Sequence, residues 1–203
     1  MNTVKKIGLF GGSFDPVHSA HVAVAQVALA QLQLDELRWV PAGQPWQKSR
    51  PLSDAAHREA MVRLAIDGER GFVLDRTELR RRGPSFTLDT VRELQAAPGA
   101  AGSEWVLILG QDQYTGLHTW RDWRELLGLV TLAVARRPDA PAEASVDVAA
   151  FAHLTIEAPM TDISSSDIRA RVAAGLPIDG LVPAAVAGYI ETHGLYRSLP
   201  PRS

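Results

Sequence analysis

Residues 7–21, IGLFGGSFDPVHSAH, carry the clearest indication of a fold in this chain. Ile7 to Phe10 form a short apolar run that ends at two glycines, which is typical of a buried parallel strand breaking into a loop. Asp15-Pro16 supplies an N-cap and a first-turn proline for a helix. The Ala, Val and Leu residues between His21 and Leu32 suit a largely buried helix. The stretch therefore predicts a strand, a glycine loop and a helix.

Short apolar runs and helical patterns alternate along the rest of the chain. Further strands are predicted at residues 37–40, 72–74, 105–109 and 130–135. Further helices are predicted at 54–67, 87–95 and 183–192, with a short one after the serine cap at 164–167. Residues 41–52 form a polar loop, and 96–103 and 136–145 are expected to be surface connections. This alternation predicts an α/β fold, with a parallel sheet flanked by helices.

Composition limits the class of protein. The 203 residues suit a single domain, 1–203, and 46% hydrophobic with 22% charged residues is typical of folded chains. The net charge of −2 offers no overall field for a polyanion, so no nucleic acid is expected as a partner. The absence of cysteine excludes disulfides, thiolate nucleophiles and cysteine-ligated metals.

The sequence also bears on compartment and assembly. No apolar run reaches the roughly 18 residues of a membrane span, and Ile7–Phe10 is too short for a signal-peptide core. We therefore expect a cytoplasmic protein without a membrane partner. A homo-oligomer remains open, because helix faces that serve a core and those that serve a dimer look alike in one sequence.

The glycine loop has the properties of a phosphate site. Glycines let the backbone approach a ligand, and the next helix presents free N–H groups and a partial positive charge. His18 and His21 lie three residues apart on one helical face, where imidazoles can donate to phosphate oxygens and offset developing charge. Two alternatives stay open: a tight turn beside a core histidine, and a zinc site, for which no third ligand stands out nearby.

A second candidate anion site lies near the other end of the chain. The segment Ile163-Ser164-Ser165-Ser166-Asp167-Ile168-Arg169 combines hydroxyl donors, a helix N-terminus and an arginine one turn further on. All three features can hold the same anion. Alone, the pattern is more typical of a serine cap followed by a solvated arginine.

Both segments resemble signatures of the nucleotidyltransferase superfamily. Residues 11–21 match its G-x-F-D-x-x-H-x-G-H pattern except at Ala20, where the pattern has glycine, and 163–169 match I-S-S-T-x-I-R with Ser166 for threonine. The resemblance implies a Rossmann-like doubly wound parallel sheet with helices on both faces and a small C-terminal helical part at about 163–197. It also implies that ATP is bound by Gly11, Gly12, Ser13, Phe14, His18, His21, Ile163, Ser164, Ser165 and Arg169.

The middle of the chain resembles the bacterial nicotinate-mononucleotide adenylyltransferases. The segments that carry this resemblance are Val40–Gly43, Arg80, Gly83–Thr90, Ile108–Asp112, Thr119–Trp120, Arg136–Pro138 and Gly194–Arg197. The resemblance implies that the mononucleotide is bound by Gly12, Ser13, Lys48, Thr87, Leu88, Asp112, Trp120 and Arg121.

General chemistry suits these assignments. Trp120 offers a ring on which a pyridinium can stack, although a half-buried tryptophan packing a loop fits equally well without the resemblance. Backbone N–H groups at Thr87 and Leu88 suit a carboxylate, because they lie at a predicted helix start. Asp112 follows a predicted strand at the ligand-binding edge of a parallel sheet, where it suits ribose hydroxyls, or caps the next helix.

The implied reaction joins nicotinate mononucleotide and ATP to give nicotinate adenine dinucleotide and pyrophosphate, with Mg²⁺ entering with ATP. The residues implied in catalysis are His18, His21, Lys48 and Arg169, and no chain residue is expected to ligate a resident metal. One alternative is another small-molecule adenylyl- or cytidylyltransferase, such as a pantetheine-phosphate enzyme. A second alternative is a non-catalytic nucleotide-binding regulator.

The loop before Pro51 departs from the family pattern. A histidine usually precedes the lysine there, and this chain has Gln47 before Lys48. Lys48 still supplies a positive charge for phosphate, whereas a neutral Gln47 removes a potential cation and proton carrier. We expect catalysis to be weaker than with histidine at this position, but not abolished.

Overall fold

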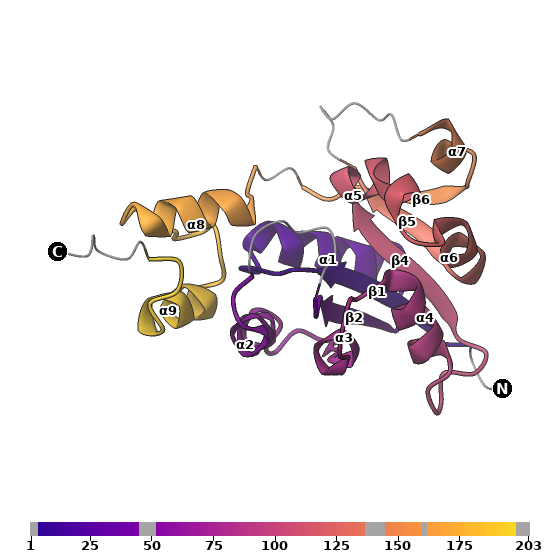
Figure 1. The fold of residues 1–203 in the computed structure, drawn as a ribbon, viewed down its shortest axis with the longest axis horizontal. Coiled ribbons are helices and arrows are strands. Elements are labelled where there is room, and N and C mark those ends of the chain that lie inside the picture. Colours follow the sequence, from indigo (N-terminus) through magenta and orange to yellow (C-terminus); the bar gives the residue numbers. More distant parts are fainter. Residues whose placement is uncertain (1–3, 45–51, 137–144, 160–161, 198–203) are drawn as a thin grey trace.

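The computed structural model describes residues 4–44, 52–136, 145–159 and 162–197, and in these ranges six strands form one parallel sheet (Figure 1). The strands are β1 (Lys6–Gly12), β2 (Glu36–Pro41), β3 (Phe72–Leu74), β4 (Glu104–Gly110), β5 (Thr131–Ala135) and β6 (His153–Ile156). The helices are α1 (Ser19–Gln31), α2 (Ala55–Ala65), α3 (Thr77–Arg80), α4 (Thr87–Gln95), α5 (Gln111–Thr115), η1 (Leu117–Thr119), α6 (Trp123–Leu129), α7 (Val146–Ala149), α8 (Ser165–Ala173) and α9 (Ala184–Thr192).

Both faces of the sheet are buried, which explains why its central strands are continuous apolar runs. In β4, Val106 and Ile108 pack into the core on the side of α1, α2, α8 and α9. Leu107 and Leu109 point the other way and pack with α4 and α6. Successive strand residues alternate between faces, so one uninterrupted run feeds two cores. The predicted doubly wound α/β sheet with helices on both faces is confirmed.

The strand order reverses at the centre of the sheet. The order β3-β2-β1-β4-β5-β6 means that the chain first builds outward from β1 through β2 to β3 and then restarts beside β1 with β4. Connections therefore leave the carboxyl ends of β1 and β4 in opposite directions and open a crevice between them, where ligands usually bind in such folds. The glycine loop follows β1, so it lies at this crevice.

Several predicted elements are confirmed with their boundaries. The strand at 72–74 and the helix at 87–95 coincide with β3 and α4, and Ser164 is the N-cap of α8, accepting from the backbone N–H of Asp167 at 3.1 Å. The predicted role of Asp15-Pro16 as helix cap is wrong. Helix α1 begins at Ser19 with His18 as its N-cap, because the Asp15 carboxylate is buried and hydrogen-bonded to Ser53 and Tyr196 instead.

Other elements escaped prediction. The edge strand β6 exposes His153 and Leu154, so it lacks the apolar run that marks an interior strand. Short helices such as α3 and α7 span four residues, too few for a helical period to show. Among the described residues no helix is long and apolar enough to cross a membrane.

Candidate active site

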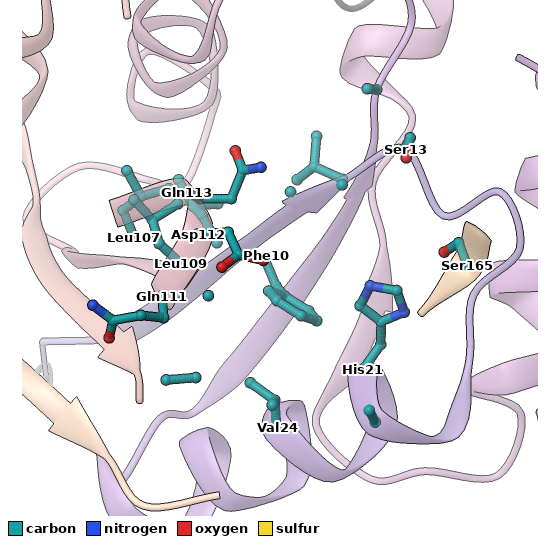
Figure 2. A pocket seen from close by; sticks show the side chains of 18 of the residues that line it. Phe10, Ser13, His21, Val24, Leu107, Leu109, Gln111, Asp112, Gln113 and Ser165 are labelled. Atoms are coloured by element: carbon teal, nitrogen blue, oxygen red, sulfur yellow. The ribbon is translucent and has the colours of Figure 1, made fainter. Parts of the chain in front are cut away.

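A cavity of about 900 Å³ opens at the reversal between β1 and β4. Gly11 and Gly12 line it from the end of β1, and Gly110 and Gln111 from the end of β4. Figure 2 shows Gln111, Asp112 and Gln113 at one end and Ser13, His21 and Ser165 at the other, with Phe10 between them. One cavity therefore brings together the two candidate anion sites and the segment expected to bind ribose.

The histidine pair lies at the start of α1. The backbone N–H of His18 donates to Nδ1 of His21 at 3.2 Å, and the two rings stack with their centroids 3.6 Å apart. Burial, and secondarily the neighbouring His18, lowers the pKa of His21 well below its usual value. His21 is therefore neutral at pH 7, and because Nδ1 accepts a hydrogen bond, its proton resides on Nε2. It can donate to a ligand, but it does not add a positive charge.

Aromatic packing fixes the His21 ring. The rings of Phe10 and Phe14 lie edge-on to it, at centroid distances of 6.0 and 5.1 Å. Phe14 is almost fully buried and its backbone φ is +47°, an unusual value for a bulky residue. The structure thus places the Phe14 side chain in the core beneath the site, not in the lining of the cavity.

Helix α8 is docked onto the loop that precedes α1. The Ser165 hydroxyl donates to the Pro16 carbonyl at 2.9 Å, and Arg169 Nη1 donates to the Asp15 carbonyl at 2.7 Å. The other terminal nitrogen of Arg169 donates to the Ser166 hydroxyl at 3.0 Å. These contacts bring Ile163, Ser164, Ser165 and Arg169 to the same cavity as Gly11, Gly12, Ser13, His18 and His21. The two motifs, about 150 residues apart, face one space.

The opposite wall carries the residues expected to bind the acceptor. Thr87, Asp112, Trp120 and Arg121 all line the cavity. Nη2 of Arg121 donates to both carboxylate oxygens of Asp89, at 2.7 and 2.9 Å, and the guanidinium lies 4.0 Å from the Phe86 ring centroid. The Leu88 side chain is buried in the core, and Leu88 is not among the residues that line the cavity. Lys48 and Gln47 lie outside the described residues.

The cavity is also lined by polar residues that the sequence analysis did not assign to the site, among them Glu78, Thr90 and Arg136. Glu78 is 9% exposed and accepts a hydrogen bond from the Thr90 hydroxyl at 2.9 Å. In the sequence it stands within the charged run Arg76–Arg82, which looks like a solvated face, so no local pattern marks it as buried. Arg136 directly follows β5, a position at the binding edge of the sheet that could have been used to find it.

The buried carboxyl predicts a pH-dependent effect on stability. Burial raises the pKa of Glu78, and hydrogen bonds offset this rise only in part. The neutral carboxyl therefore adds to the free energy of unfolding at low pH, and this contribution is lost as pH rises through the folded-state pKa. Glu78→Gln cannot titrate but retains an acceptor for Thr90. We expect its Tm, relative to wild type, to rise between pH 4 and pH 8 in thermal unfolding. Glu93→Gln, an exposed control on α4, should show no comparable rise; a falling Glu78→Gln difference would contradict the argument.

The chain is similar to known proteins along nearly its whole length. Residues 9–171 match the family model described as cytidylyltransferase-like. The chain is 50% identical to a protein of Methylibium petroleiphilum named "Probable nicotinate-nucleotide adenylyltransferase", over 98% of this chain and 94% of the relative. It is 48% identical to a Bordetella petrii protein of the same name, over 96% of this chain and 100% of that protein.

Solved structures show the same fold at low identity. The chain matches a Plasmodium falciparum nicotinic acid mononucleotide adenylyltransferase complexed with NaAD, with a TM-score of 0.77 and 21% identity over 95% of this chain and 97% of that one. It also matches a structure from Vibrio parahaemolyticus described as a putative nicotinate-nucleotide adenylyltransferase, with a TM-score of 0.70 and 18% identity over 97% of this chain and 98% of that one.

Proposed function

Because the chain belongs to the cytidylyltransferase-like family and, within it, to the nicotinate-nucleotide adenylyltransferases, we propose that it transfers the adenylyl group of ATP to nicotinate mononucleotide. The observation that carries this proposal is that one cavity contains both sets of binding residues. The histidine and serine motifs lie at one end, and the wall formed by Thr87, Asp112 and Trp120 lies at the other. Two nucleotides bound at these ends would meet above Phe10, where the bond must form. The product is nicotinate adenine dinucleotide, an NAD precursor.

The reaction is a displacement at phosphorus. A phosphate oxygen of the mononucleotide attacks the α-phosphorus of ATP, and the bond from that phosphorus to the bridging oxygen breaks as pyrophosphate leaves with the electron pair. No enzyme group becomes covalently attached, so the protein contributes alignment and charge stabilisation. His21 Nε2, His18 and the Arg169 guanidinium are the donors that we assign to the ATP phosphates, beside the partial positive charge at the N-terminus of α1.

Metal is proposed to enter with ATP. Among the described residues no group of three or more His, Asp or Glu side chains could hold an ion. We propose that a Mg²⁺ entering with ATP would neutralise charge on the departing pyrophosphate. The chain's own groups then bind and orient the triphosphate.

The acceptor wall supports recognition of the nicotinate group. We assign the Trp120 ring to stacking on the pyridinium, the backbone N–H groups of Thr87 and Leu88 to the carboxylate, and Asp112 to the ribose. Arg121 is paired with Asp89, so its proposed contribution is a fixed positive charge beside the site and the joining of α4 to the Trp120 segment. Lys48 remains a proposed phosphate contact.

Two broader proposals complete this assignment. We propose that the chain works as one domain, because Tyr196, near the C-terminus, bonds Asp15 in the loop after β1. We also propose that it acts in the cytoplasm on small molecules, without nucleic acid, as a monomer or a homo-oligomer. Size-exclusion chromatography with light scattering would distinguish these two states.

Pyrophosphate release tests the function directly. Purified protein is given ATP and Mg²⁺ with nicotinate mononucleotide, nicotinamide mononucleotide or pantetheine phosphate as separate acceptors. We expect rapid release with the nicotinate form and a strong preference over the nicotinamide form. Equal use of both pyridine nucleotides would keep the reaction but reject the assigned carboxylate contacts. Pyrophosphate release only with pantetheine phosphate would exclude nicotinate mononucleotide as the acceptor. Release with none of the three acceptors would favour a non-catalytic regulator.

A further inference from the structure

Arg58 is a buried, extensively hydrogen-bonded cation near the cavity, although it does not line it. This residue of α2 is 2% exposed. Its Nε donates to the Ser53 carbonyl at 3.0 Å, and Nη1 donates to the carbonyls of Ser13 at 3.1 Å and Ala42 at 2.6 Å. Nη2 donates to the Gly43 carbonyl at 3.3 Å. A single guanidinium thus binds four backbone carbonyls.

These carbonyls belong to three separate segments. Ser13 lies in the loop after β1, Ala42 and Gly43 form the turn after β2, and Ser53 precedes α2. Arginine suits this task because its planar fork offers five donors and stays charged. Burial lowers the pKa of Arg58, and the buried Asp15 carboxylate is the first of the groups that oppose this effect. The charge is therefore held by four carbonyl acceptors and by the nearby Asp15 carboxylate.

Backbone hydrogen bonds extend this connection across the cavity. The N–H of Ala42 donates to the Gly12 carbonyl at 2.8 Å, which joins the turn to the phosphate end. The N–H of Ser85 donates to the Gln44 carbonyl at 3.0 Å, which joins the same turn to the segment that leads into Thr87. The turn after β2 is therefore the mechanical link between the two ends of the cavity.

The turn after β2 also packs tightly against α3. A Cβ at Gly43 would lie 2.2 Å from the Glu78 carbonyl oxygen, so only glycine fits against α3. Ser53 is held from both directions, since its N–H donates to the Asp15 carboxylate at 3.3 Å while its carbonyl accepts from Arg58. Arg58 thus lies where three hydrogen-bonded backbone segments converge.

We propose that Arg58 is a positioning residue that sets the spacing between the donor-phosphate end and the acceptor wall of the cavity. This inference rests on the proposed adenylyl transfer. Because in-line displacement requires the two nucleotides to be aligned, a misplacement of about 1 Å costs on the order of 10²-fold in rate. Each wall keeps its own binding groups without Arg58, so affinity for the separate substrates should change much less than kcat.

Arg58→Lys tests this role. Lysine retains the charge but presents one compact ammonium group. This group cannot form all the hydrogen bonds by which the guanidinium binds the carbonyls of three backbone segments. Measured below the Tm of both proteins, kcat should fall by about tenfold or more, with the KM of ATP and of acceptor each within about threefold. The matched control is Arg63→Lys on the same helix, an exposed residue paired with Glu59, which should leave kcat within about twofold.

Hydrogen exchange supplies a measurement independent of catalysis. In Arg58→Lys the amides of Ala42 and Ser85 should exchange faster than in wild type and in Arg63→Lys. Faster amide exchange with an unchanged kcat would show that Arg58 has only a structural role. Unchanged amide exchange would show that Arg58 does not hold the two ends of the cavity together. Either result overturns the proposal. If Arg58→Lys does not fold, Arg58→Gln, which keeps two amide donors without a buried charge, provides the same comparison. If the wild-type protein releases no pyrophosphate, the proposed function fails. Hydrogen exchange at Ala42 and Ser85 would still show whether Arg58 joins the two ends of the cavity.

Discussion

Replacing His21 by alanine is expected to lower kcat by about 10²–10³-fold, the usual cost of losing one donor to developing charge in a transition state. The KM of either substrate should change by less than about threefold, because the contact strengthens only as negative charge builds on the phosphate oxygens. Initial rates of pyrophosphate release at varied ATP and varied acceptor would measure both quantities.

The neutral state of His21 makes this prediction more specific. Glutamine can place an amide N–H close to the position of Nε2, so His21→Gln should retain more activity than His21→Ala. Because burial holds the pKa of His21 well below its usual value, raising pH from 6 to 8 should not remove its contribution. An equally inactive His21→Gln, together with a loss of wild-type kcat as pH rises through this range, would indicate an imidazolium and contradict the assignment.

Arg169→Ala is expected to lower kcat/KM for ATP by about 10²-fold. Its guanidinium lines the cavity and simultaneously ties α8 to the Asp15 carbonyl, so the substitution removes a charge and loosens the serine motif. Arg169→Lys keeps the charge without the fork and should recover part of the loss. Steady-state kinetics at saturating acceptor, with Tm measured in parallel, separates the effect on ATP from unfolding.

Arg171→Ala is the matched control for Arg169. Arg171 lies on the same helix, is exposed, and donates to the Pro177 carbonyl at 3.0 Å away from the cavity lining. It should leave kcat/KM within about twofold. If Arg169→Ala retained wild-type kcat/KM for ATP, Arg169 would only dock α8, and the assigned phosphate contact would be wrong.

Local patterns were sufficient for most of the fold. The run Trp105–Leu109 shows an interior strand because every residue faces one of two cores, and Leu88, Val91 and Leu94 show α4 because their spacing follows one helix face. These signals need no knowledge of the partner. By contrast, β6 is recognisable only beside β5, because its exposed side chains carry no periodic apolar pattern.

The candidate site divides in the same way. The glycine loop, the histidine pair and the Ser165–Arg169 motif are contiguous, so their chemistry is visible in short stretches of sequence. That both motifs face one cavity follows from contacts between residues far apart in the chain, such as Ser165 with Pro16. The protonation state of His21 likewise depends on burial, which no spacing of residues reveals.

Sequence alone therefore predicted strands β1 to β5, the longer helices and the candidate phosphate-binding motifs, because each depends on residues within a turn or two of one another. Only the tertiary structure decided that Glu78 and Arg58 are buried and that Phe14 belongs to the core. Burial of a charged side chain requires partners to replace water, and those of Arg58 come from residues 13, 42, 43 and 53. Such partners meet only when the sheet has formed and its connecting loops have closed over the ends of β1 and β2.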